Sequence, residues 1–312
     1  MKRIFFNNFI IISVVFLIGC SQPTYQHLVD ANGYQFNVRI AGEFENGQPV
    51  NELVVFLHGC PETSFMWVDT MAFLAQHGYS CVAPDQRGYS PGARPLLVSQ
   101  YELDKLVSDI IALVDTTDVH KFHLVGHDWG AVIGWAINQK HPDRIQTWSA
   151  MAVPHNFSFF DKRFNDSDQK KASAYINFLK LPYPIPELFI SAFNYNALKA
   201  GWTSHSQEEI DEYMNVFNQK NALRGAINWY RALPNDLNDF PSYIQNTVAT
   251  PTVYFWGNRD QYVLRTAAEN CAQYMTGPFE FVELDSSHWI IQDQKTTVNE
   301  KILELIQNNP IQ

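Results

Sequence analysis

Hydrophobic and polar positions follow two different patterns along the chain. Residues 27–30 and 34–40 alternate, which is typical of strands with one face in water. The next apolar runs, at 52–57, 80–84 and 122–125, are nearly continuous, as in strands buried on both faces. Helical spacing of apolar residues appears in three stretches between and after these runs: 66–77, 101–115 and 131–139. This alternation of strands and helices predicts a mostly parallel sheet flanked by helices, an α/β fold.

The alternation stops between residues 154 and 240. This stretch is rich in amphipathic, aromatic segments broken by Pro182, Pro184 and Pro186, and it has no strand pattern. Strands then return at 252–256 and 279–284, and helices at 267–274 and 296–307. We therefore expect a core in two parts, residues 27–153 and 241–312. Residues 154–240 would form a helical cap over the carboxyl edge of the sheet, where open α/β folds bind ligands.

The N-terminal residues have the features of a targeting segment. Lys2 and Arg3 precede an apolar run, 9–18, that is too short to span a bilayer, so residues 1–19 are predicted to be a signal peptide. Residues 17–20 resemble the bacterial lipobox, which implies acylation of Cys20 and a short leader over 20–26. The expected location is the bacterial cell envelope, facing the periplasm or exterior, and Ser21 favours the outer membrane. The alternative is an ordinary signal peptide with a chance cysteine.

Charge and cysteine content exclude several classes of partner. The formal net charge is −10 and no run of Lys and Arg occurs, which argues against a nucleic-acid partner. Beyond Cys20, the odd number of cysteines, Cys60, Cys81 and Cys271, implies no disulfide framework. Cys81 lies in an apolar run and is expected to be a small buried residue. No metal-ligand cluster is evident, so neither a metal nor a cofactor is expected.

One pentapeptide, Gly126-His127-Asp128-Trp129-Gly130, follows an apolar run and opens a helical pattern. That context is the one required of a nucleophile elbow, with aspartate where such turns often carry serine. The two glycines permit a sharp, strained turn, which argues that Asp128 has a role other than packing. The alternative is that Asp128 caps the following helix.

Three other positions supply the partners that a nucleophile needs. Asp260 follows the strand at 252–256, and His288 follows the strand at 279–284, which gives the chain order nucleophile, acid, histidine. The backbone amides of Cys60 and Trp129 are expected to form an oxyanion hole.

These motifs resemble the α/β-hydrolase superfamily and, within it, the epoxide hydrolases. The H-G-x-P motif is matched at 58–61 and the D-x-R-G-Y motif at 85–89, and the elbow is identical. The resemblance implies an eight-stranded sheet with a helical cap inserted after strand 6. It also implies two cap tyrosines, which correspond to Tyr175 and Tyr230, with Tyr183 as the alternative to Tyr175.

An aspartate nucleophile restricts the substrate, because a carboxylate attacks an alkyl carbon and forms an ester. The hypothesis is hydrolysis of a small-molecule epoxide to a vicinal diol. Tyr175 and Tyr230 would protonate the ring oxygen, and His288, oriented by Asp260, would activate water. Three alternatives remain open: a haloalkane dehalogenase, a non-catalytic lipid-anchored binding module, and an esterase. Cys60 stands where a dehalogenase often has a halide-binding asparagine. The natural epoxide and the oligomeric state stay open.

Overall fold

The apolar runs form the centre of one eight-stranded sheet in the computed structural model, which describes residues 24–311. The strand order is β1-β2-β6-β5-β7-β8-β9-β10. Their bounds are β1 (Tyr25–Ala31), β2 (Tyr34–Ala41), β5 (Leu53–Leu57), β6 (Ser80–Pro84), β7 (Phe122–His127), β8 (Ile145–Met151), β9 (Thr252–Gly257) and β10 (Phe279–Leu284). β2 pairs antiparallel with β1 and β6, and the other neighbours are parallel. A separate hairpin joins β3 (Phe44–Glu45) to β4 (Gln48–Pro49).

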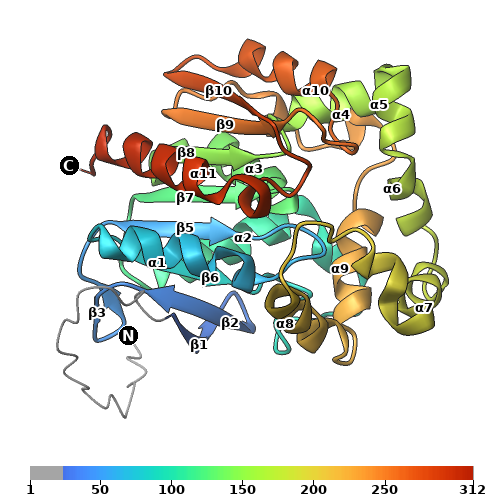
Figure 1. Ribbon diagram of the computed structural model, residues 1–312, viewed down its shortest axis with the longest axis horizontal. Coiled ribbons are helices and arrows are strands. Elements are labelled where there is room, and N and C mark those ends of the chain that lie inside the picture. Colours follow the sequence, from blue (N-terminus) through green and yellow to red (C-terminus); the bar gives the residue numbers. More distant parts are fainter. Residues whose placement is uncertain (1–23, 312) are drawn as a thin grey trace.

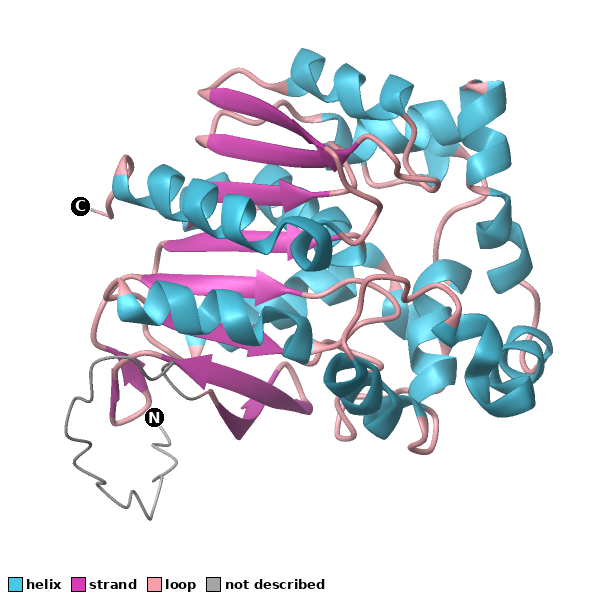
Figure 2. Cartoon of the chain, in the orientation of Figure 1, coloured by secondary structure: helices cyan, strands magenta, loops and turns pink. Residues whose placement is uncertain are grey.

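Helices cover both faces of the sheet (Figures 1 and 2). Helices α1 (Val68–Gln76) and α11 (Ile290–Gln307) pack side by side on one face, and α2 (Leu103–Asp115) and α3 (Trp129–Lys140) pack on the other. Every residue of β5, β7 and β9 is buried, as expected for strands enclosed on both faces. The α/β fold expected from the sequence is therefore confirmed.

The cap helices lie between β8, the sixth strand of this sheet along the chain, and β9. They extend beyond the carboxyl ends of the parallel strands (Figure 1). Their bounds are α4 (Asn156–Asn165), α5 (Ser167–Ala172), α6 (Ala174–Leu179), α7 (Ile185–Lys199), α8 (Gln207–Phe217) and α9 (Ala222–Arg231). α10 (Arg265–Glu269) follows β9 in the core. Short 3-10 turns occur at Ser64–Trp67, Val98–Tyr101, Pro142–Arg144, Leu237–Asp239, Ser242–Gln245 and Asn270–Tyr274.

Two elements differ from the sequence-based expectation. The apolar pattern gave no strand for β8, because Gln146, Thr147 and Ser149 interrupt it, although six of its seven residues are buried. The last helix begins at Ile290 and not at Thr296, with a kink at Gln294. The expected burial of Cys81 is confirmed. Within residues 24–311, no helix has the length and apolar character needed to cross a membrane.

The contact between α3 and β5 depends on Gly130. A Cβ atom at Gly130 would lie 2.0 Å from the carbonyl oxygen of Leu57, at the end of β5. A Cβ atom at Gly126 would lie 2.6 Å from the carbonyl oxygen of Gly130. Both distances are far below contact distance, so only glycine lets the strand, the turn and the helix approach so closely.

We expect Gly130→Ala to destabilise the protein by about 1–3 kcal/mol or more, because the added methyl group must push α3 away from β5. The measurement is the free energy of unfolding in urea. Gly201→Ala is the matched control, since its Cβ would meet only one carbonyl oxygen, that of Leu198, at 3.3 Å. Equal unfolding free energies for the two variants would contradict the prediction.

Candidate active site

The turn between β7 and α3 lifts Asp128 above the carboxyl edge of the sheet. Its backbone has φ 50° and ψ −117°, a strained conformation for a residue with a Cβ atom. The loop after β5 passes directly beneath, and a Cβ atom at Gly59 would lie 2.6 Å from that of Asp128. The Asp128 side chain makes no capping hydrogen bond to α3, so helix capping does not explain the residue.

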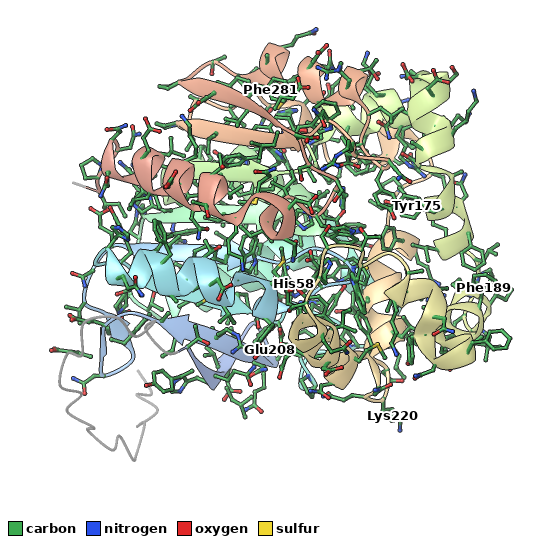
Figure 3. The ribbon with its side chains drawn as sticks, viewed as in Figure 1. His58, Tyr175, Phe189, Glu208, Lys220 and Phe281 are labelled. Carbon is green, nitrogen blue, oxygen red and sulfur yellow. The ribbon has the colours of Figure 1, made fainter. Side chains whose placement is uncertain are left out.

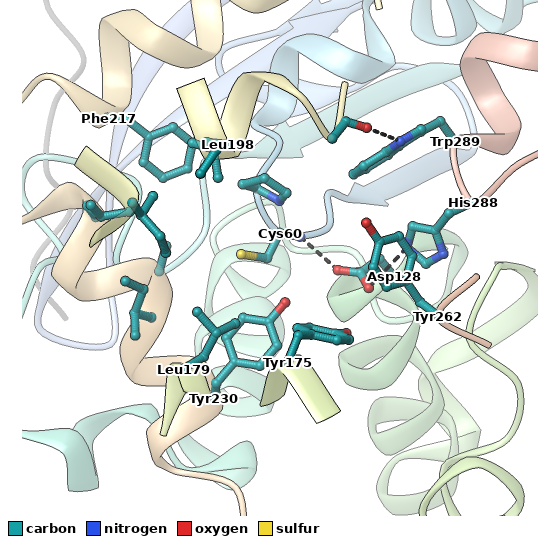
Figure 4. Close-up of a pocket in the computed structure, with 17 residues that line it drawn as sticks. Cys60, Asp128, Tyr175, Leu179, Leu198, Phe217, Tyr230, Tyr262, His288 and Trp289 are labelled. Carbon is teal, nitrogen blue, oxygen red and sulfur yellow. Dashed lines mark hydrogen bonds and ion pairs between the residues drawn. The ribbon is translucent and has the colours of Figure 1, made fainter. Parts of the chain in front are cut away.

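His288 lies between two carboxylates, and Figure 4 shows its ring beside one of them, that of Asp128. Its Nε2 is 3.3 Å from Asp128 Oδ2, and its Nδ1 is 2.7 Å from Asp260 Oδ2. The other oxygen of Asp260 accepts hydrogen bonds from the amides of Tyr262 and Val263, at 2.7 and 3.0 Å. The structure thus brings the predicted nucleophile, histidine and acid into one hydrogen-bonded row.

The two carboxylates determine the charge of His288. Burial alone would lower the pKa of His288, but the negative charges of Asp260 and Asp128 and their hydrogen bonds raise it well above its ordinary value. The two carboxylates therefore favour the imidazolium form of His288. Since one of its two counter-charges is the nucleophile, its pKa depends on the state of Asp128.

One of the two predicted oxyanion-hole amides, that of Cys60, contacts the Asp128 carboxylate. The amide of Cys60 donates to Asp128 Oδ1 at 2.8 Å. Trp129 is the first residue of α3, where a backbone N–H has no partner within the helix. The Cys60 thiol lines the same cavity, and burial raises its pKa to about 12, so it stays protonated and uncharged.

Tyr175 and Tyr230 lie on the cap side of the same cavity (Figure 4). Tyr175 is on the side of α6 that faces the sheet (Figure 3), and Tyr230 is on α9. Their ring centroids are 6.1 Å apart. Burial and the nearby charge of Asp128 raise the pKa of both hydroxyls well above the ordinary value, so both carry a proton. Tyr183 is 54% exposed and lies outside the cavity lining.

Comparison with known proteins agrees with this geometry. Residues 52–294 match the family model described as the alpha/beta hydrolase fold. The chain is 29% identical to Epoxide hydrolase A of Mycobacterium tuberculosis, over 91% of this chain and 97% of that protein. It is 32% identical to human Epoxide hydrolase 4, over 87% of this chain and 75% of that protein. The chain belongs to the epoxide hydrolase family of α/β hydrolases.

Solved structures of epoxide hydrolases share the whole fold. Potato (Solanum tuberosum) epoxide hydrolase I superposes with a TM-score of 0.78 at 26% identity, covering 92% of this chain and 100% of that one. Within residues 24–311, no group of three or more His, Cys, Asp and Glu side chains is arranged to hold a metal ion.

Sequence analysis did not identify one further residue of this epoxide hydrolase site, Tyr262. Its ring centroid is 5.0 Å from that of His288 and 5.4 Å from that of Tyr175, so it bridges the base and a cap tyrosine. The sequence feature that could have indicated Tyr262 is its position, two residues after Asp260 in a loop at the carboxyl edge of the sheet.

A buried ion pair beside the nucleophile was also missed. Glu62 is fully buried; its carboxylate accepts hydrogen bonds from His127 Nδ1 at 2.8 Å and from His205 Nε2, in the cap, at 3.1 Å. His127 Nε2 is 2.9 Å from the carbonyl oxygen of His288, which can only accept a hydrogen bond. Burial would raise the pKa of Glu62, but the two histidines lower it. Glu62 and the two histidines connect the elbow, the loop of His288 and the cap.

We expect Asp128→Asn to lower the pKa of His288, because the substitution removes one of its two negative neighbours. NMR titration of the His288 ring measures this value in both proteins. In the unchanged protein the ring should stay protonated well above pH 6.5, and in the variant it should lose its proton at lower pH. An unchanged or higher pKa in the variant would contradict the electrostatic argument.

Proposed function

We propose that the protein hydrolyses epoxides to vicinal diols through a covalent ester on Asp128. One observation carries the proposal: a carboxylate and two protonated tyrosines, Tyr175 and Tyr230, face one apolar cavity. A nucleophile opposite two proton donors suits a substrate whose leaving oxygen remains attached and must be protonated. The names of the relatives in Mycobacterium tuberculosis and human, and of the potato structure, support the same activity.

In the first half-reaction an oxygen of Asp128 attacks a ring carbon and the ring C–O bond breaks. The ring oxygen takes a proton from Tyr175 or Tyr230, which leaves an alkyl ester and a tyrosinate. Their raised pKa values keep both hydroxyls protonated until an alkoxide, a far stronger base, forms. Proton donors of this kind typically contribute about 10²- to 10⁴-fold in rate.

Ester formation also makes His288 able to act as a base. Asp128 loses its negative charge on alkylation, so the pKa of His288 falls, because only Asp260 still stabilises the imidazolium. His288 then releases the proton that restores the tyrosinate to tyrosine. The histidine becomes neutral, and therefore basic, at the step that needs a base.

In the second half-reaction neutral His288 takes a proton from water, and the hydroxide oxygen attacks the ester carbonyl of Asp128. The amides of Cys60 and Trp129 stabilise the resulting oxyanion; losing one such donor typically costs about 2.7–4 kcal/mol. The ester C–O bond breaks, and the departing oxygen takes the proton of the new carboxyl group, which gives the diol. The ionised Asp128 and protonated His288 of the free protein are restored.

His288→Gln should form the ester but hydrolyse it slowly, since no base remains to activate water. After incubation with styrene oxide, mass spectrometry should show a protein heavier by one intact epoxide, with the label in the peptide that contains Asp128. His120→Gln, a substitution at an exposed histidine, is the control and should show no persistent adduct. Unmodified His288→Gln protein, together with no diol from the unchanged protein, would refute the proposal.

We also propose that Cys20 carries a lipid anchor that places the enzyme in the cell envelope. Cys20 lies outside the residues that the structure describes, and the support is the sequence at 17–20. Cys20→Ala should abolish labelling of the expressed protein by a radioactive fatty acid and leave an unprocessed precursor, whereas Ser21→Ala should be labelled normally. Undiminished labelling of Cys20→Ala would rule out the anchor.

A further inference from the structure

The cavity at the candidate site has two arms of very different size. The large arm has a volume of about 170 Å³ and the small arm about 20 Å³. Both arms are lined by the same five central residues, Asp128, Tyr175, Tyr230, Tyr262 and His288. An epoxide ring attacked by Asp128 therefore sits where the arms meet, and the substituents of its two carbons must enter different arms.

The large arm is lined mainly by apolar side chains of the cap. Figure 4 shows several of them around the reacting groups. They include Leu179, Ile190, Leu198, Phe217, Leu223 and Ile227. At roughly 10–15 Å³ for each water-sized group, the arm accommodates a substituent of roughly 11 to 17 heavy atoms.

The small arm ends against a closed apolar wall. The wall residues outside the shared set are buried: Trp129, Val132, Val153, Phe159, Phe160, Ile176, Leu233 and Val263. A space of about 20 Å³ holds one water-sized group. Away from the five shared residues, the wall offers a water molecule only one polar side-chain group, the indole N–H of Trp129, whereas a methyl group needs no polar partner. The small arm therefore suits hydrogen or methyl.

Neither arm offers a counter-ion for a charged substituent. Among the described residues that line the two arms, no Lys or Arg occurs, and the charged groups are Asp128 and His288, which pair with each other. Burying a substrate carboxylate without a partner is costly. Asp128 itself would repel it.

We infer that the site selects uncharged epoxides with one apolar substituent in the large arm and only hydrogen or methyl on the other ring carbon. This inference rests on the proposed function and specifies its substrate class. Epoxides with two long substituents, such as those within a fatty-acid chain, and epoxides with a terminal carboxylate are excluded as good substrates.

The test compares three isomers of equal carbon number by kcat/KM: hexyloxirane, trans-methyl(pentyl)oxirane and trans-dipropyloxirane. The dipropyl isomer should be slower than hexyloxirane by at least about tenfold, since one misplaced methylene is typically worth about 10- to 200-fold. The methyl isomer should react nearly as fast as hexyloxirane. Oxiranylhexanoate, which replaces the terminal methyl group of the hexyl chain by a carboxylate, should also be poor.

Two variants, each on a helix that lines one arm, test which arm causes the selectivity. Val132→Ala widens the small arm and should reduce the preference for hexyloxirane over the dipropyl isomer several-fold. Ile227→Ala removes similar bulk from the large arm and should leave that ratio unchanged. Equal kcat/KM for the two isomers, or an unchanged ratio in Val132→Ala, would overturn the inference while the proposed function stands. No turnover of any epoxide, and no ester in His288→Gln, would refute the proposed function itself.

Discussion

The site depends on the close backbone approach of β5 and its following loop to the elbow at Asp128. Glycine occupies both contact points: Gly130 against the end of β5, and Gly59 beneath the Asp128 side chain. This spacing lets the Cys60 amide reach the Asp128 carboxylate at 2.8 Å. A wider gap would relax the strained turn and also withdraw the amide, so the proposed nucleophile and the proposed oxyanion-hole donor depend on the same backbone contact.

The cap tyrosines must also be held in a fixed position. Residues 85–89, the D-x-R-G-Y segment, do this for Tyr230. The carbonyl oxygen of Arg87 accepts a hydrogen bond of 2.7 Å from Trp229 Nε1, next to Tyr230 on α9. A Cβ atom at Gly88 would lie 2.8 Å from the backbone of Gly225, one turn earlier on the same helix. Arg87 is itself held by the buried Asp109, at 2.6 Å. This segment contributes no residue to the cavity lining but holds Tyr230, the proposed proton donor, in position near Asp128.

The sequence predicts the residues whose place follows from the strand that they end. It does not predict the contacts that form only when the cap packs onto the core. Asp128, Asp260 and His288 each follow an apolar run, and parallel strands bring such positions to one edge. Strand β8 was hidden by its polar residues, two of which, Thr147 and Ser149, are buried and not exposed as their chemistry suggests. The contact of Glu62 with His205, 143 positions away, is visible only once the cap is folded onto the core. Tyr175 was placed by family resemblance, since nothing local distinguishes it from other cap aromatics.

Two imidazoles lie 5.1 Å apart at this site, and their partners decide which acts as base. His127 lies between the Glu62 carboxylate, 2.8 Å from Nδ1, and the carbonyl oxygen of His288, 2.9 Å from Nε2, and neither partner changes during the proposed reaction. In this reaction His127 therefore has a structural role. His288 has one fixed partner, Asp260, and one partner that reacts, Asp128. A histidine can change from acid to base during the reaction only if one of its counter-charges disappears when the ester forms. His288 lies beside Asp128 and meets this condition, so its position makes it the base in the proposed reaction.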